Sequence, residues 1–311
     1  MIDTWIVFSR FLHYSATLVL FGLVLFPLYA YPRGGLDGVS KRNRMLATSW
    51  SLSLLVLISG VFWFVGVAAN MVDASVGWET ARLVLTETAY GALSLMRLGI
   101  VAAVICVTAL IAVRPMHGLD GLLAALSAAL VASLAGTGHT QVEDGPARLG
   151  HMFADALHLV AAGAWLGGLV FLLYLAATSL HSNSPERRRL EACNAAIRFS
   201  RMGYLAVGTI VASGLVNSWF LVGPIANLVE TDYGRLLLIK IAFFAAMVGL
   251  AGINRLYVVP MLANPAVSAY EDFGLRRLRL HVLLEQCLGL AIILIVGLLG
   301  TMEPPVNISN P

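Results

Sequence analysis

Residues 151–168 read HMFADALHLVAAGAWLGG, an apolar stretch in which two histidines and one aspartate recur at the spacing of a helix face. His151, Asp155 and His158 stand at positions i, i+4 and i+7, so a helix would carry all three on one side. The apolar run continues from 152 to 180, long enough to cross a bilayer. Ionisable residues inside such a run are costly and mark candidate functional sites. We therefore expect a membrane helix with a polar face.

The composition of the whole chain agrees with a membrane protein. Its 311 residues are 59% hydrophobic and 12% charged, whereas a soluble domain has about 25% charged residues. This difference excludes a soluble enzyme, a disordered chain and a fibrous one. The net charge of +3 gives no indication of a nucleic-acid partner. The three cysteines are far apart and form no CxxC motif, so neither a disulfide framework nor a zinc site is predicted.

Eight apolar runs predict an all-α, polytopic membrane protein with eight transmembrane helices and the lipid bilayer as its partner. The connections after the first, third, fifth and seventh runs hold most of the Lys and Arg residues, whereas the other connections are acidic. The positive-inside rule then places the basic connections in the cytoplasm and both termini outside. The runs are 4–31, 45–69, 92–113, 119–137, 152–180, 202–222, 235–259 and 280–300.

The two halves of the chain resemble each other. Aligning LHYSATLVLFGLVLF around His13 with LHLVAAGAWLGGLVF around His158 matches several apolar and small residues. The motif ETAYG at 87–91 pairs with ETDYG at 230–234, and six residues after each motif stands a basic residue, Arg97 or Lys240. We expect two parallel four-helix repeats, 1–137 and 151–311, joined by an outer loop at 138–150 and related by an axis along the membrane normal.

The duplication makes His13 and His158 equivalent and predicts a paired-histidine site in the outer half, between the repeats. Imidazole suits copper, and thioethers add selectivity for Cu(I), so the candidate metal ligands also include Met96 and Met152. His151 and Asp155 would lie on the path above the pair, and His139 at the outer mouth. The alternatives are hydrogen-bonded core histidines, methionines that only pack, and haem b with His13 and His158 as axial ligands.

Other ionisable residues have simpler interpretations. Arg97 and Lys240 are expected to brace the two halves through ion pairs. His281 and Glu285 stand at i and i+4 and predict a hydrogen bond or ion pair, with an inner metal-release site as the alternative. The chain has no GxxxxGK[ST] or DKTG motif for ATP hydrolysis and no CxxCH motif for c-type haem. We therefore expect a non-enzymatic protein.

Several segments resemble the copper-resistance D (CopD) family of bacterial inner-membrane proteins. They are RFLHY at 10–14, DALH at 155–158 followed by AWLGG at 164–168, YGRLLLIK at 233–240, and Asn254-Arg255 followed by Pro260. The resemblance implies a multi-pass protein of the cytoplasmic membrane that moves copper across it, with a periplasmic copper-binding CopC-like protein as a partner. The motifs extend over most of the chain and are moderately specific.

The predicted orientation can be tested with reporter fusions. Fusions at residues 184 and 265 should report a cytoplasmic location, because both positions lie in basic connections. Fusions at residue 144 and at the C-terminus should report the outer side. Alkaline phosphatase and green fluorescent protein fusions would measure both, and opposite activity at any two of these positions would overturn the orientation.

Overall fold

The computed structural model describes residues 4–31, 39–72, 77–114, 116, 118–137, 145–179, 185–263 and 271–306. Eight helices of this part are long and apolar enough to cross a membrane, which confirms the predicted all-α membrane fold. The first four spans are α1 (Thr4–Ala30), α2 (Val39–Val72), α4 (Ala89–Val113), and α5 (Leu119–Ala132) with its continuation η2 (Ser133–Thr137). The last four are α6 (Gly145–Ser179), α7 (Pro185–Val222), α9 (Asp232–Ile253) and α11 (Glu271–Leu299).

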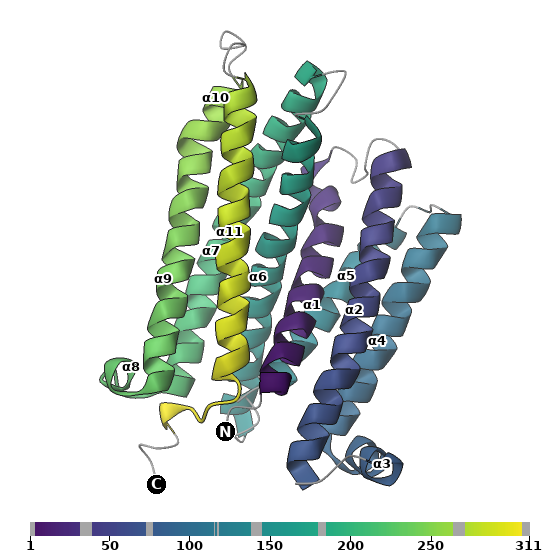
Figure 1. Cartoon of the computed structure of the whole chain (residues 1–311), viewed down its shortest axis with the longest axis vertical. Helices are drawn as coiled ribbons and strands as arrows, with labels where there is room; N and C mark the ends of the chain where they lie inside the picture. The colour runs from purple at the N-terminus through teal and green to yellow at the C-terminus, as the bar shows by residue number, and fades with distance from the viewer. Residues whose placement is uncertain are drawn as a thin grey trace.

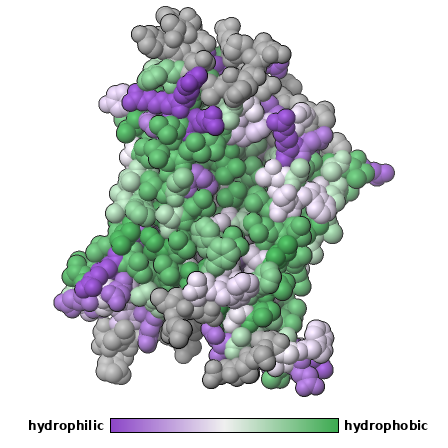
Figure 2. All heavy atoms as spheres, in the orientation of Figure 1, coloured by the Kyte–Doolittle hydropathy of each residue, from purple (hydrophilic) through white to green (hydrophobic). Residues whose placement is uncertain are grey.

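The helices stand side by side in two groups that meet at α1 and α6 (Figure 1). On one side of this central pair lie α2, α4 and α5, and on the other lie α7, α9 and α11. The first and last described residues lie at the same end of the molecule, as an even number of spans requires. Apolar residues cover most of the middle of the face in Figure 2, with hydrophilic residues gathered towards both ends, as a bilayer-spanning protein requires.

Small residues bring the backbones of α1 and α6 into contact. A Cβ atom added to Gly22 would lie 2.1 Å from the carbonyl oxygen of Gly163 and 2.7 Å from Cα of Gly167. A Cβ atom on Gly167 would meet α1 in the same way, 2.6 Å from Cα of Gly22. Helices in membranes associate through such close packing of small residues, because lipid offers no hydrophobic driving force. The contact holds the two helix groups together.

Two short helices, α3 (Trp78–Glu87) and α8 (Asn227–Glu230), explain the repeated ETxYG motif. The Thr88 hydroxyl caps α4 by accepting from the Gly91 amide at 2.9 Å, and the Thr231 hydroxyl caps α9 by accepting from the Gly234 amide at 3.0 Å. Each glycine faces the preceding short helix so closely that a Cβ atom would lie 2.1 Å from a backbone oxygen. Neither short helix was predicted from the sequence. Their match supports the repeat, although superposition of the halves stays a prediction.

Several helix ends differ from the expected ones. α7 begins at Pro185 and α11 at Glu271, well before the apolar runs at 202 and 280, because polar and basic turns extend these helices beyond the apolar segment. α6 begins at Gly145, so residues 145–150, expected in the outer loop, are helical. After α9 the chain makes a π-helical turn, η4 (Asn254–Val258), and the short helix α10 (Val259–Ala263).

The glycine contact between α1 and α6 predicts a specific sensitivity to added methyl groups. Gly167→Ala should destabilise the protein by about 1–3 kcal/mol, because the new Cβ meets backbone atoms that cannot give way without moving a helix. Gly249→Ala in α9 is the matched control, because no heavy atom lies within 4 Å of its added Cβ. Thermal unfolding in detergent measures both. Equal midpoints for the two variants would contradict the described contact.

Candidate functional site

His13 is fully engaged by neighbours within the first helix group. The ring is 4% exposed, and Nδ1 lies 3.0 Å from the carbonyl oxygen of Val56 and 3.2 Å from the Ser59 hydroxyl. A carbonyl only accepts, so Nδ1 carries the proton and donates. The other nitrogen, Nε2, then accepts from the guanidinium of Arg97 at 2.5 Å. Both ring nitrogens are therefore used, and no lone pair remains for a metal ion.

Arg97 is itself held in place by one further hydrogen bond. Its other terminal nitrogen donates to the Ser133 hydroxyl at 2.7 Å, and the side chain is 7% exposed. The sequence analysis expected Arg97 to brace the two halves through an ion pair. The structure instead places it inside the first group, where it joins α4 to His13 and to η2.

His158 has the same surroundings on one side of its ring. Nδ1 lies 3.0 Å from the hydroxyl of Ser213 in α7, as Nδ1 of His13 lies beside Ser59 in α2. The next residue is a glycine in both cases, and a Cβ atom there would lie 3.5 Å from Cε1 of His158, or 3.1 Å from Cε1 of His13. The small side chains leave room for the rings.

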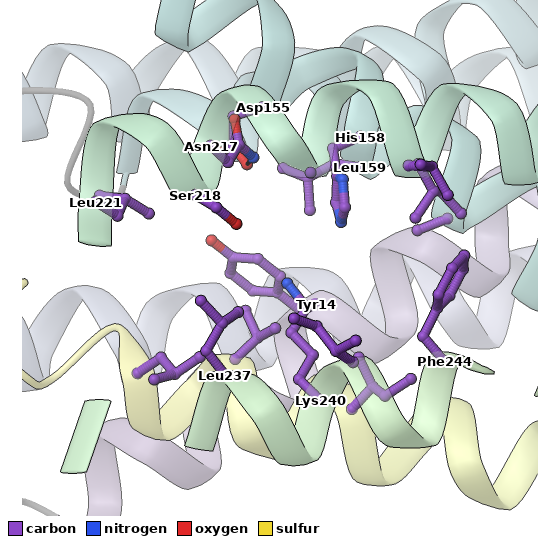
Figure 3. A pocket seen from close by; sticks show the side chains of 18 of the residues that line it. Tyr14, Asp155, His158, Leu159, Asn217, Ser218, Leu221, Leu237, Lys240 and Phe244 are labelled. Carbon is purple, nitrogen blue, oxygen red and sulfur yellow. Dashed lines mark hydrogen bonds between the residues drawn. The ribbon is translucent and has the colours of Figure 1, made fainter. Parts of the chain in front are cut away.

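The other side of the His158 ring differs from that of the His13 ring. Lys240 lies across from His158, whereas Arg97 binds His13 directly. His158 lines a cavity of about 370 Å³ between α6, α7, α9 and α11, with α1 contributing part of its wall. Figure 3 shows His158 and Lys240 on opposite sides of this cavity. Among the described residues, Nε2 of His158 has no hydrogen-bond partner, so its lone pair faces the open volume.

The polar wall of the cavity comes from one face of α6 and from α7. Asp155 accepts from the side-chain amide of Asn217 at 3.0 Å, and the carbonyl oxygen of that amide is buried without a partner among the described residues. His151 is 1% exposed and stacks on Phe220 with 4.7 Å between ring centroids. His151, Asp155 and His158 all line the cavity, as the helical spacing predicted.

A second cation lines the cavity from α1. Arg10 is 7% exposed and donates to the carbonyl oxygen of Gly300, just beyond α11, at 2.6 Å. Its guanidinium also lies over the ring of Trp63 in α2, 5.3 Å from the centroid. Arg10 therefore connects the two helix groups near the cavity. The sequence analysis did not single out Arg10 or Asn217 as site residues.

The structure does not bring His13 and His158 together. Gly22 and Gly167, at the contact between α1 and α6, each lie nine residues after the aligned histidine, or about two and a half helical turns. Each histidine therefore projects from the side of its helix that faces away from the contact. The hydrogen bonds agree, since His13 binds residues of α2 and α4 and His158 binds α7.

The remaining candidate ligands are not gathered around either histidine. Met96 is 49% exposed on the outside of α4. Met152 is partly buried beside His151 but does not line the cavity. His139 lies outside the described residues. Within the described part of the chain, no three His, Cys, Asp or Glu side chains lie close enough to form a metal site.

Comparisons with known proteins identify the family. Residues 1–149 match the model of the copper resistance protein D-like N-terminal domain, and residues 193–299 match the model of copper resistance protein D. No solved structure matches the fold.

Three curated relatives carry informative names. The chain is 33% identical to copper resistance protein D of Pseudomonas syringae pv. tomato, over 95% of each chain. It is 30% identical to the inner membrane protein YebZ of Escherichia coli, over 97% of this chain and 98% of that protein. It is 29% identical to the copper transport protein CutJ of Bacillus subtilis, over 80% of this chain and 46% of that protein. With both halves matched by family models and two relatives aligned over nearly their whole length, the chain belongs to the copper resistance protein D family.

Proposed function

We propose that this multi-pass inner-membrane protein moves copper across the cytoplasmic membrane and that copper passes through the cavity of the second helix group. The observation that carries the proposal is the contrast between the two histidines. Arg97 occupies Nε2 of His13, whereas Nε2 of His158 faces an open cavity. A neutral imidazole nitrogen is a good copper ligand, and the names of the relatives supply copper as the cargo.

His158 is the anchoring ligand in this proposal, and Asp155 and His151 act as successive ligands rather than as one coordination shell. Along α6 they lie about 4.5 Å and about 10 Å from His158 at the helical rise of 1.5 Å per residue. A pathway requires sites that bind well enough to admit the ion and weakly enough to release it. A row of one- and two-ligand positions meets this requirement better than a closed shell.

The charged side chains that line the cavity, taken together, are compatible with a positively charged cargo. Lys240 and Arg10 would repel copper, and Asp155 supplies the opposite charge on the wall that carries His158. Lys240 lies on the opposite wall of the cavity from Asp155 (Figure 3), and an arriving copper ion would compete with its ammonium for the negative charge of the carboxylate. Asp155 therefore determines whether the cavity, which Arg10 and Lys240 already line, tolerates the additional positive charge of copper.

The proposed site revises the predicted pairing of His13 with His158. In the revised form His13 and Arg97 form a buried hydrogen-bonded pair that does not bind copper, and of the two aligned histidines only His158 is a copper ligand. Haem b between the halves, the alternative, needs both rings directed at the α1–α6 contact, and the hydrogen bonds of both rings lead away from it. We keep the outward termini as part of the proposal, with copper entering from the end that carries them. A periplasmic CopC-like protein would deliver copper at that end.

The two histidine variants test the revised site. His158→Ala should remove most of the bound copper, because the anchoring nitrogen is lost. His13→Ala should keep wild-type copper per folded molecule and lower the stability instead, since it leaves Arg97 without its buried acceptor. Elemental analysis with a visible spectrum of the purified proteins measures copper and reports any haem Soret band. Equal copper loss in both variants would restore the paired site, and a Soret band that disappears with His158 would favour haem.

The carboxylate can be tested separately. Asp155→Asn should lower copper affinity by about 10–100-fold, the usual effect of losing a carboxylate beside a metal-binding histidine. Asp232→Asn is the matched control, because Asp232 has 83% of its side chain exposed and pairs with Arg235 outside the cavity. Competition with a copper-chelating dye measures both affinities. Unchanged affinity in Asp155→Asn would exclude the carboxylate from the copper path.

A further inference from the structure

A second buried polar cluster lies in the same helix group, at the far side of the cavity wall. Glu285 in α11 is 1% exposed. Its Oε1 accepts from the side-chain amide of Asn254 at 2.9 Å, and its Oε2 lies 3.4 Å from the indole nitrogen of Trp165. The copper path proposed above uses none of these side chains for binding. A carboxyl group buried this deeply inside a membrane helix bundle is a functional candidate in its own right.

Asn254 joins Glu285 to a histidine nearer the end of the bundle. The Oδ1 atom of Asn254 lies 2.7 Å from Nδ1 of His281, and because an amide oxygen only accepts, the imidazole donates. His281 precedes Glu285 by one helical turn and is partly exposed. Asn254 stands at the start of the π-helical turn η4, a kind of irregularity that recurs at functional sites. The cluster thus leads from a buried carboxyl group towards the end of the bundle where α11 begins.

No charged side chain among the described residues forms an ion pair with Glu285. On its own helix the ionisable groups nearest in sequence are Cys287, which is exposed, and His281, which binds Asn254, while Arg277 lies over Phe273. On the helices packed against α11, the ionisable groups that line the cavity are Arg10 and Tyr14 of α1, His151, Asp155 and His158 of α6, and Tyr233 and Lys240 of α9. Arg255 follows Asn254 and is partly exposed.

The hydrogen-bond partners of Glu285 are therefore neutral donors. Their neutrality determines whether the buried carboxyl group is ionised. Burying an unpaired carboxylate costs several kcal/mol even after relaxation, and two neutral hydrogen bonds offset only part of that cost. A buried acid without a cation takes up a proton instead. In the conformation that the structure shows, Glu285 therefore holds a proton.

Trp165 connects this carboxyl group to the cavity. Its ring lines the cavity and lies 5.9 Å, edge to face, from the ring of Phe244, another lining residue. The nitrogen of the same indole is the donor to Glu285. Any repacking of the cavity wall when an ion enters changes the position of the indole and with it the surroundings of the carboxyl group.

We propose that Glu285 is a proton-binding site that couples copper movement to proton movement. The inference rests on the proposed function, because the coupled ion is the copper in the cavity. Glu285 takes up its proton from the side of the cavity, which Trp165 separates from the carboxyl group, and gives up that proton on the side where His281 lies when copper enters and the wall rearranges, so that a proton crosses with copper. A difference in pH across the membrane then drives or opposes copper movement.

Glu285→Gln tests the coupling, because the amide keeps the size and the acceptor oxygen but cannot ionise. In proteoliposomes with copper as the probe, an imposed pH gradient should accelerate copper uptake by the wild type. In Glu285→Gln the gradient-driven rate should fall by about tenfold or more, equivalent to at least about 1.4 kcal/mol, with unchanged equilibrium copper affinity. Glu230→Gln is the control, since Glu230 lies on the exposed helix α8. A wild-type response to the gradient in Glu285→Gln would overturn the proposal.

Infrared difference spectra give a readout that does not depend on copper. The wild type should show the carbonyl stretch of a protonated carboxylic acid, and Glu285→Gln should lack this band. Glu285→Asp, which keeps the carboxyl group, should retain a band and part of the coupling. Persistence of the whole band in Glu285→Gln would overturn the proton site. If the wild type binds no copper, the proposed function fails, and the spectra still establish whether Glu285 carries a proton.

Discussion

The close approach of α1 and α6 at Gly22, Gly163 and Gly167 determines how the rest of the bundle is arranged. The two backbones touch at these glycines, and His13 and His158, which stand nine residues before Gly22 and Gly167, project from the opposite sides of their helices. His13 therefore lies among α2 and α4, and His158 beside α7 at the cavity. The two helix groups meet along α1 and α6, and Arg10 and Tyr14 of α1 also line the cavity of the second group. One glycine contact thus decides that the protein has two independent histidine environments.

Much of this architecture can be predicted from the sequence, because it depends on local patterns. The eight spans follow from apolar run length, and the shared face of His151, Asp155 and His158 follows from helical spacing. Two features could not be predicted in this way. The direction of His13 relative to His158 depends on which face of each helix meets its neighbour. The cavity depends on how much of the space opposite each histidine is filled by the facing side chain. Only the packed structure specifies how much of that space is filled.

The difference between Arg97 and Lys240 turns two similar environments into one closed and one open site. An arginine presents a planar fork of donors, which here fills the space between His13 and Ser133. A lysine ends in a single ammonium on a flexible stem, and the cavity beside His158 remains. The same helix group carries Glu285, so the proposed copper and proton sites share a wall through Trp165. The first helix group, by contrast, contributes the buried hydrogen bond between His13 and Arg97, and the cation Arg10.

The threonine-capped turns at Thr88 and Thr231 have a consequence for the history of the protein. Similar threonine-capped turns stand before α4 and α9, and a cavity lies beside His158 in the second helix group. If the gene arose by doubling, shape was retained in both copies while chemistry diverged through a few internal side chains. Under that history, one copy would have become free to take on a purely structural role, and the ancestral half would have had to work as a symmetric pair.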